Sequence, residues 1–202
     1  MAITFSIDQL AVSLVLDGEL KKTLGTAFSF IKPNWVATAK HVVLKHGVPR
    51  DHLLISPYKS PSIRARVLFA HPQVDLAVLE VDRNLCLRPL FPVHHSLAGS
   101  NGLVCAGYAP SKSAPGDPAV LFVNEIPSFQ TEVRERMSLN EEIIVFDASF
   151  LEGGHSGGPI FGSGGGVVGA IIESFNVAGQ PRGRGTGLAP LVAHLSFVET
   201  LG

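Results

Sequence analysis

The sequence contains little charge and no long apolar run, and each absence excludes a class of protein. Charged residues make up 16% of the 202 residues, and the formal net charge is −1. Such a chain offers no electrostatic basis for binding nucleic acid or an acidic membrane surface. No apolar stretch approaches the roughly 20 residues that a membrane-spanning helix requires. With 46% hydrophobic residues, the chain is expected to fold as a well-packed globular protein with no nucleic-acid or membrane partner.

Cysteine is also scarce, and the first residues lack the marks of export. The two cysteines, Cys86 and Cys105, both lie in apolar surroundings, which favours buried free thiols over a disulfide. The first 17 residues include Asp8 and Asp17 but no basic segment, unlike a signal peptide. We therefore expect a cytoplasmic protein.

What the chain does contain is a succession of short β-rich runs separated by Gly, Pro, Asn and Asp. About a dozen strands are expected, in two groups and without alternating helices. This pattern is typical of an all-β fold built from two antiparallel barrels. We expect one domain with an N-terminal barrel in residues 1–85, a connector in residues 86–100 and a C-terminal barrel in residues 101–202.

Toward the C-terminus the pattern is less regular. Residues 182–184, R-G-R, are interpreted as a solvated loop, residues 187–190 as the start of the last strand, and residues 192–201 as a short terminal helix. Residues 164–169, G-G-G-V-V-G, match the dinucleotide-binding pattern G-x-G-x-x-G. That pattern requires a helix to open within it, whereas the residues from Val167 onward are typical of a strand. We therefore predict a hairpin turn here and no nucleotide cofactor.

The chemically most informative stretch is residues 153–159, G-G-H-S-G-G-P. Glycine is favoured where the backbone takes a positive φ or approaches another group closely. Four glycines around Ser156 therefore indicate a tight loop that presents the hydroxyl and leaves neighbouring N–H groups available. A nucleophile beside such donors is what acyl transfer requires. The simpler alternative is a glycine-rich turn that happens to contain a serine.

A serine hydroxyl needs a base within hydrogen-bond distance, and the best of the eight histidines is His41. It follows a run of small and apolar residues, 35–39, where a strand should end. Four others lie at polar positions or element ends and are expected at the surface: His46, His52, His71 and His194. His94 and His95 lie on the connector, and the side chain of His155 should point away from its neighbour Ser156. His94 and His95 lack the carboxylate or cysteine neighbours of a zinc site, so no metal is expected.

A carboxylate is needed to orient the imidazole, and Asp75 is the strongest candidate. It stands directly before an apolar strand, where a partly buried charge requires a partner. Without such a partner, Asp75 would be an ordinary residue at the start of a strand. Asp51 and Asp82 have less apolar surroundings, and Asp147 precedes the serine by only nine residues.

Together these segments resemble the three signatures of trypsin-like serine peptidases. The segments are T-A-K-H-V-V at residues 38–43, D-L-A-V-L-E-V at residues 75–81 and G-H-S-G-G-P at residues 154–159. They occur in the order His, Asp, Ser that this family uses. The segments G-T-A-F at residues 25–28 and G-L-A-P at residues 187–190 are similar to the HtrA/Deg-like bacterial branch. The similarity extends over residues 10–195.

The resemblance implies two six-stranded antiparallel β-barrels with the active site in the cleft between them. His41 and Asp75 would come from the first barrel and Ser156 from the second. His41 would act as the base, Asp75 would orient it, and the N–H groups of Gly154 and Ser156 would form the oxyanion hole. The expected activity is endopeptidase cleavage of a protein or peptide substrate, without a cofactor.

The family layout also implies a pocket for the side chain before the cleaved bond. The residues expected around it are Phe150, Leu151, Ile172, Glu173, Ser174 and Gly187. Phe150 and Leu151 stand where an enzyme specific for basic residues would have an aspartate, and an arginine would be costly to bury there unpaired. We expect cleavage after medium apolar residues such as Leu, Val or Met. If the Glu173 carboxylate points inward, Lys or Arg would be preferred.

The chain departs from the family at two points. His155 occupies a position where Asp or Asn is common, and no PDZ domain follows within these 202 residues. In secreted relatives a new amino terminus pairs with that Asp, so His155 predicts a site that needs no N-terminal processing and is controlled by a partner or a further domain. The alternatives to a peptidase are an inactive protease fold used as a binding module, and esterase or other acyl-transfer activity at the same site.

Overall fold

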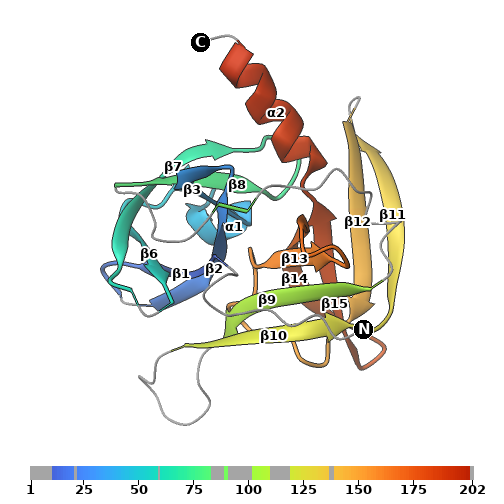
Figure 1. The fold of residues 1–202 in the computed structure, drawn as a ribbon. Helices are drawn as coiled ribbons and strands as arrows, with labels where there is room; N and C mark the ends of the chain where they lie inside the picture. The colour runs from blue at the N-terminus through green and yellow to red at the C-terminus, as the bar shows by residue number, and fades with distance from the viewer. Residues whose placement is uncertain are drawn as a thin grey trace.

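The computed structural model describes residues 11–20, 22–58, 60–82, 89–90, 102–109, 119–136 and 139–200. The first half forms a closed antiparallel barrel with the strand order β1-β2-β3-β8-β7-β6 (Figure 1). These strands are β1 (Val12–Asp17), β2 (Lys22–Phe30), β3 (Lys32–Thr38), β6 (Leu53–Pro57), β7 (Ile63–Ala70) and β8 (Ala77–Val81). Helix α1 (Lys40–Val43) and the hairpin of β4 (Leu44–Lys45) and β5 (Val48–Pro49) are inserted after β3.

The burial pattern explains why these segments close into a barrel. In β7, Ile63 and Ala65 are buried while Arg64 and Arg66 are exposed, the alternation of a strand with one face in the core. Strand β2 is different, because every residue from Gly25 to Phe30 is buried. A strand buried on both faces must be covered from outside the barrel as well, and the second half of the molecule provides that cover.

The second half is a seven-stranded antiparallel sheet with the order β10-β9-β13-β14-β15-β12-β11. Its strands are β9 (Leu103–Ala109), β10 (Val120–Ile126), β11 (Phe129–Arg136), β12 (Leu139–Asp147), β13 (Pro159–Gly162), β14 (Val167–Val177) and β15 (Gln180–Gly187).

The two end strands of this sheet, β10 and β11, are consecutive in the chain and separated only by Pro127 and Ser128. Proline cannot donate a backbone hydrogen bond and interrupts a ladder. Counted as one strand bent at Pro127, β10 and β11 complete a ring of six strands. The expected two-barrel, all-β fold is confirmed. In the second barrel, the end strands β10 and β11 are connected by the bend of the chain at Pro127 and not by a ladder of hydrogen bonds.

The segment 182–184 is a strand and not a loop, so that interpretation was wrong. It lies within β15, which pairs with both β12 and β14, and the last strand ends at Gly187 where it was expected to begin. Gly183 and Gly185 are buried because side chains from neighbouring strands fill their space: a Cβ at Gly183 would lie 2.6 Å from the Phe146 ring. Glycine weakens a strand intrinsically, and tertiary packing overrides that tendency here.

The turn between β13 and β14 agrees with the predicted hairpin. Gly162 N donates to Gly166 O at 3.0 Å, and Val167–Val177 continues as a strand. The dinucleotide-like glycine pattern at residues 164–169 is therefore a turn followed by a strand.

Helix α2 (Ala189–Thr200) begins three residues before the predicted helix and returns to the first half of the molecule. Leu191 and Leu195 join the apolar core of the first barrel, and the His194 ring stacks on Phe69 at 4.2 Å. Because α2 follows the last strand of the second half, it ties the two halves together. No helix among the described residues is long and apolar enough to cross a membrane.

Candidate active site

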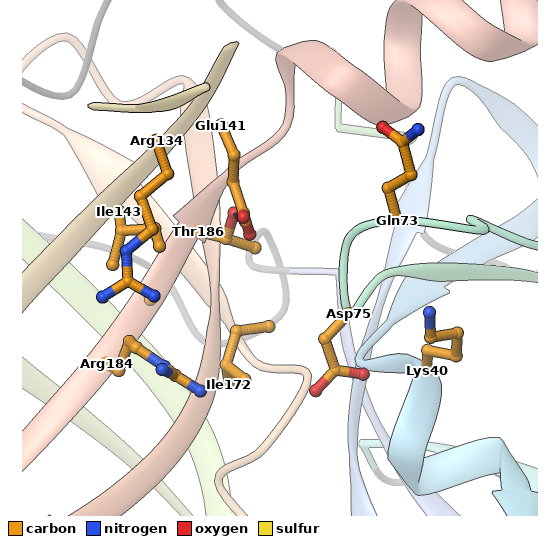
Figure 2. A pocket seen from close by; sticks show the side chains of 10 residues that line it. Lys40, Gln73, Asp75, Arg134, Glu141, Ile143, Ile172, Arg184 and Thr186 are labelled. Atoms are coloured by element: carbon orange, nitrogen blue, oxygen red, sulfur yellow. Dashed lines mark hydrogen bonds between the residues drawn. The ribbon is translucent and has the colours of Figure 1, made fainter. Parts of the chain in front are cut away.

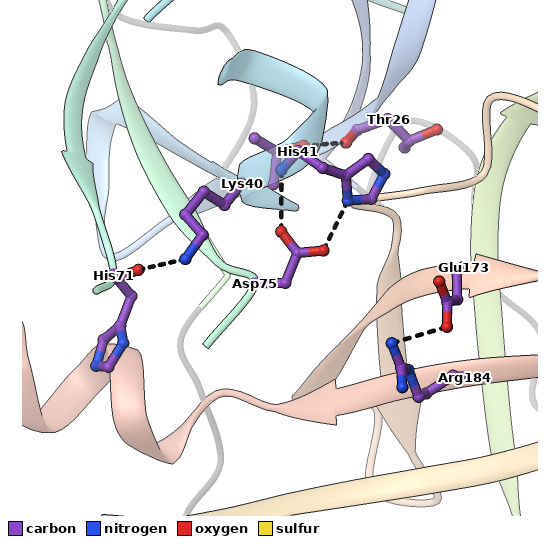
Figure 3. Close-up of polar contacts among 8 residues, drawn as sticks. Thr26, Lys40, His41, His71, Asp75, Glu173 and Arg184 are labelled. Carbon is purple, nitrogen blue, oxygen red and sulfur yellow. Dashed lines mark hydrogen bonds and ion pairs between the residues drawn. The ribbon is translucent and has the colours of Figure 1, made fainter. Parts of the chain in front are cut away.

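His41 and Asp75 are brought together by the first barrel. His41 lies in α1, directly after β3, and Asp75 lies in the loop before β8. Strands β3 and β8 are paired neighbours, so the end of one lies beside the start of the other. His41 Nδ1 is 2.7 Å from Asp75 Oδ2, and the His41 backbone N–H donates to Asp75 Oδ1 at 2.9 Å (Figure 3). One carboxylate therefore binds both the ring and the backbone of the same histidine.

Lys40 supports the same loop from the other side. Its backbone N–H donates to Asp75 O at 3.2 Å, and its Nζ donates to His71 O at 2.8 Å. Burial of Asp75 acts to raise its pKa, but the hydrogen bonds and charge of His41, together with the charge of Lys40, outweigh burial and hold the pKa of Asp75 below its ordinary value. The carboxylate is therefore ionised at neutral pH, as an orienting group must be.

His71 stabilises the turn that directly precedes Asp75. Its Nδ1 accepts hydrogen bonds from the backbone N–H groups of Gln73 and Val74, at 3.2 and 3.1 Å. The ring is buried, and burial, with the charges of His194 and Lys40, lowers the pKa of His71. A neutral His71 can keep accepting both bonds, because protonation would fill its Nδ1 lone pair. The sequence pattern had suggested a surface role for this residue.

Ser156 lies in the loop between β12 and β13, which carries two glycines with positive φ. Gly154 has φ +107°, and His155 N–H donates to Glu152 O at 3.4 Å, which together describe a type II turn. Gly157 has φ +85°, and a Cβ there would collide with Thr38 Oγ1 and with Thr26 O. These glycines allow the loop to press against the first barrel as closely as it does.

The loop is bonded on both sides. Ser156 O accepts from Thr26 N–H of β2 at 2.8 Å, and Gly157 N–H donates to Ile171 O of β14 at 2.7 Å. In the described part of the chain, the N–H groups of Gly154 and Ser156 donate no hydrogen bond. Within the same residues, Ser156 Oγ forms no hydrogen bond to His41. The two unoccupied donors lie on the residues from which an oxyanion hole was expected.

His155 points into the second half of the molecule and away from His41. Its ring is buried against Gly107 of β9 and contacts Phe122 at 5.9 Å between ring centres. Nδ1 lies 3.0 Å from Glu152 O, while Nε2 is buried with no hydrogen-bond partner among the described residues. Burial lowers the pKa of His155, and the hydrogen bond and charge of Glu152 oppose the shift only in part. His155 therefore supports the loop as a neutral, mainly apolar group.

The residues expected around the substrate pocket lie in different surroundings in the described part of the chain. Phe150 and Leu151 pack against the apolar core of the second half, where Phe150 stacks on Phe146 with ring centres 6.3 Å apart. Ser174 is exposed, and Gly187 is buried opposite Gly169 in the sheet.

The Glu173 carboxylate forms an ion pair with Arg184 at 2.7 Å (Figure 3). Both side chains are partly exposed, at 45% and 34%. The negative charge of Glu173 is therefore paired with the positive charge of Arg184 on β15.

Ile172 lines a cavity of about 140 Å³ beside Asp75 (Figure 2). In Figure 2, Asp75 faces Ile172 and Arg184 across the space between the two halves. The cavity wall contains both basic and acidic side chains. It is formed by Lys40, Gln73, Asp75, Arg134, Glu141, Ile143, Ile172, Arg184, Gly185 and Thr186. The cavity thus adjoins the Asp75 carboxylate, and neither Phe150 nor Leu151 lines it.

The described residues contain no group of three or more His, Cys, Asp or Glu side chains that could hold a metal ion. Cys105 is a buried free thiol of β9, and burial raises its pKa to about 12, which leaves it protonated and unreactive. Cys86, His94 and His95 lie outside the described residues, as does most of the predicted connector.

The sequence and the fold are both similar to those of known proteins. The family model described as "Trypsin-like peptidase domain" matches residues 25–169, a span that contains His41, Asp75 and Ser156. No curated protein matches the chain.

Among solved structures, the chain is similar to the inactive form of a serine-to-alanine mutant of Rv3671c from M. tuberculosis. The identity is 20% and the TM-score 0.66, and the match covers 94% of this chain and 87% of that one. It is similar to the HtrA-type protease AlgW with a tripeptide, at 20% identity and a TM-score of 0.67, covering 95% of this chain and 61% of that one. The MamO protease domain from Magnetospirillum magneticum gives 17% identity, a TM-score of 0.67, and coverage of 95% and 98%. At these identities the structural likeness concerns the fold.

Proposed function

We propose that this chain, which belongs to the trypsin-like peptidase domain family, cleaves peptide bonds in protein substrates through a triad of His41, Asp75 and Ser156. Membership of this family supports serine-peptidase activity, in agreement with the signatures at residues 38–43, 75–81 and 154–159. The assignment of individual residues is the proposal. The observation that carries it is the 2.7 Å contact between His41 Nδ1 and Asp75 Oδ2.

The contact determines which nitrogen of His41 does the chemistry. With Nδ1 bound to an ionised Asp75, the neutral ring carries its proton on Nδ1 and leaves the Nε2 lone pair available. Nε2 takes the proton of Ser156 Oγ as the oxygen attacks the substrate carbonyl, and it later gives that proton to the leaving amine. Asp75 stabilises the imidazolium that forms between these two steps.

The N–H groups of Gly154 and Ser156 complete the mechanism. Both belong to the serine loop, and neither donates a hydrogen bond within the described residues. Charge that develops on the carbonyl oxygen in the tetrahedral intermediate would be stabilised by these donors, and such donors contribute about 10²–10³ in kcat each. Water then hydrolyses the acyl-enzyme on Ser156 Oγ, with His41 again as the base.

The second candidate function is an inactive protease fold that binds a partner. It is favoured by the absence of a hydrogen bond between Ser156 Oγ and His41 in the described residues. Such contacts are often long without substrate and tighten when it binds, so this observation weighs less than the His41–Asp75 pair. The solved HtrA-type neighbours with a bound tripeptide and decapeptide support a peptide as the substrate.

Labelling with a fluorophosphonate probe separates the two functions. An active enzyme should be labelled covalently at Ser156, and Ser156→Ala should abolish labelling and reduce kcat for a peptide by about 10⁶, the loss measured for the nucleophile of another serine protease. Wild-type protein that is folded but neither labelled nor able to hydrolyse peptides would favour the inactive binding module. Turnover of esters without peptides would indicate another acyl transfer.

We further propose that cleavage follows medium apolar residues. The Phe150 and Leu151 side chains offer apolar surface before the serine loop, and the Glu173 carboxylate is paired with Arg184. A substrate lysine or arginine would have to displace Arg184 to reach Glu173. Profiling of cleavage sites with a peptide library checks this preference, and a strong preference for Lys or Arg that is lost in Glu173→Gln would overturn it.

The loop also supports activity without N-terminal processing. The His155 ring bonds to Glu152 within its own loop and lies against β9, so the loop has no acidic side chain at position 155 to receive a new amino terminus. Residues 1–10 lie outside the described residues. Comparing peptide hydrolysis by protein with a blocked Met1 and by versions trimmed up to Gly25 tests the proposal, and a hundredfold gain on trimming would contradict it.

A further inference from the structure

Thr26 of β2 forms hydrogen bonds with every polar group it has, and two of these groups bond the serine loop. It is fully buried. Its N–H donates to Ser156 O at 2.8 Å, and its Oγ1 donates to Gly154 O at 2.7 Å. The same Oγ1 accepts from Tyr108 N–H at 2.8 Å, and Thr26 O accepts from Thr38 Oγ1 at 2.7 Å. Thr26 appears with His41 and Asp75 in Figure 3.

The two loop carbonyls that Thr26 holds belong to Gly154 and Ser156, the two residues whose N–H groups would form the oxyanion hole. Gly154 has φ +107° and no side chain, so little in its own structure restricts the rotation of the adjoining peptide planes. A hydrogen bond to Gly154 O from a buried strand restricts this rotation. The bond to Ser156 O places the nucleophile's own backbone against the same strand.

The hydroxyl is needed because it donates and accepts at once. In this buried position Gly154 O requires a donor and Tyr108 N–H requires an acceptor, and a hydroxyl satisfies both. A valine in the same space would leave both backbone groups without a partner. The contact also crosses between halves: Thr26 is on the first barrel, while Tyr108 and Gly154 belong to the second.

We propose that Thr26 is a positioning residue for the reaction: its hydroxyl anchors the serine loop so that the Gly154 and Ser156 N–H groups are aimed together at the substrate oxyanion. This role rests on the proposed function, because it concerns the same loop and the same donors. Thr26 touches no reacting atom and acts through the backbone of Gly154 and Ser156.

The test compares Thr26→Val, which keeps the shape and loses the hydroxyl, with Thr26→Ser, which keeps the hydroxyl. Ser29→Ala is the control on the same strand, because it removes an equally buried hydroxyl that has no hydrogen-bond partner among the described residues. Peptide hydrolysis is measured well below the melting temperature of every variant. We expect Thr26→Val to lower kcat by about 10- to 100-fold with KM within about twofold, as expected for misplaced catalytic groups. Thr26→Ser should restore kcat to within about threefold, and Ser29→Ala should match wild type.

Equal kcat in Thr26→Val and Thr26→Ser would overturn the proposal, as would a loss in Thr26→Val that is matched by Ser29→Ala. If Thr26→Val does not fold, Thr26→Cys replaces it, since a thiol fills a similar space and forms both bonds weakly. Its kcat should lie below that of Thr26→Ser, and kcat equal to that of Thr26→Ser would contradict the role.

Amide hydrogen exchange tests the anchoring role of Thr26 independently of the proposed function. If the wild-type protein shows no Ser156-dependent labelling or hydrolysis, the proposed function fails while the anchor can still be measured. Thr26→Val should increase amide exchange in peptides covering Tyr108 and residues 153–158, and leave the β6–β7 hairpin unchanged. Unchanged exchange in the serine loop would refute the anchor whether or not the enzyme is active.

Discussion

His41 and Asp75 lie on elements of one closed barrel, whereas Ser156 lies on a loop between two strands of the other half. Two short hydrogen bonds join His41 to Asp75, and these two residues lie beside the paired strands β3 and β8. The serine loop has no ladder of its own and depends on positive-φ glycines and on contacts to β2 and β14. His41 and Asp75 are therefore brought together by one half alone, while Ser156 is placed by the docking of both halves.

Among variants that keep Ser156, the largest expected effect concerns the half that brings His41 and Asp75 together. Asp75→Asn should lower kcat by about 10⁴, the loss measured when another serine protease has its triad aspartate replaced, because an amide can leave the histidine in the wrong tautomer. Steady-state peptide hydrolysis checks this. Asp51→Asn and Asp82→Asn are the controls and should retain activity. Full activity in Asp75→Asn with loss in either control would show that the orienting residue was misassigned.

The next effect concerns docking and contrasts two glycines of the same loop. Gly157→Ala places a Cβ against Thr26 O at a residue with positive φ, and it should lower the free energy of unfolding by about 2–4 kcal/mol or prevent folding. Gly153→Ala enters open space and should change stability by less than about 0.5 kcal/mol. Urea unfolding measures both. Similar values for the two variants would show that the close approach at Gly157 is not needed.

The pH dependence of stability offers a third, smaller test. Burial lowers the pKa of His155 and of His71, so the folded protein binds these protons less readily than the unfolded chain, whose histidines titrate near pH 6.5. The free energy of unfolding should therefore decrease as the pH falls below about 6.5, with at most about 1.4 kcal/mol per pH unit from each group.

His155→Gln and His71→Gln divide this dependence between the two halves. Each variant should flatten the curve of unfolding free energy against pH between pH 5 and pH 7, the first through the serine loop and the second through the Asp75 loop. Urea unfolding at several pH values provides the measurement. A slope as steep as that of wild type in both variants would contradict the assignment of the pH dependence to these rings.

The smallest effect is expected at the ion pair of Glu173 and Arg184. Both side chains are partly exposed, and exposed pairs contribute little to stability. Glu173→Gln should change the free energy of unfolding by less than about 1 kcal/mol and leave the preference for apolar residues unchanged. Glu132→Gln, which breaks the exposed pair with Arg134, is the matched control. A gain or loss of cleavage after Lys or Arg in Glu173→Gln alone would make Glu173 a specificity residue.

Much of this protein follows from its sequence. The glycines around Ser156, the apolar strand after Asp75 and the small residues before His41 are local patterns, and each reflects a backbone or burial requirement that a short segment expresses by itself. The all-β class follows in the same way from short β-rich runs and turn residues. These features need no knowledge of which strands become neighbours.

Other features were decided only by tertiary structure. Strand β15 is rich in glycine because the Phe146 ring and the Ile160 side chain occupy the space beside Gly183 and Gly185, and no local pattern reveals that. Phe150 and Leu151 pack against the apolar core of the second half, a contact that their position in the chain does not reveal. Thr26 became the anchor of the serine loop only when β2 met residues more than 80 positions later in the chain, because a hydroxyl acquires its role from the donors and acceptors that folding places around it.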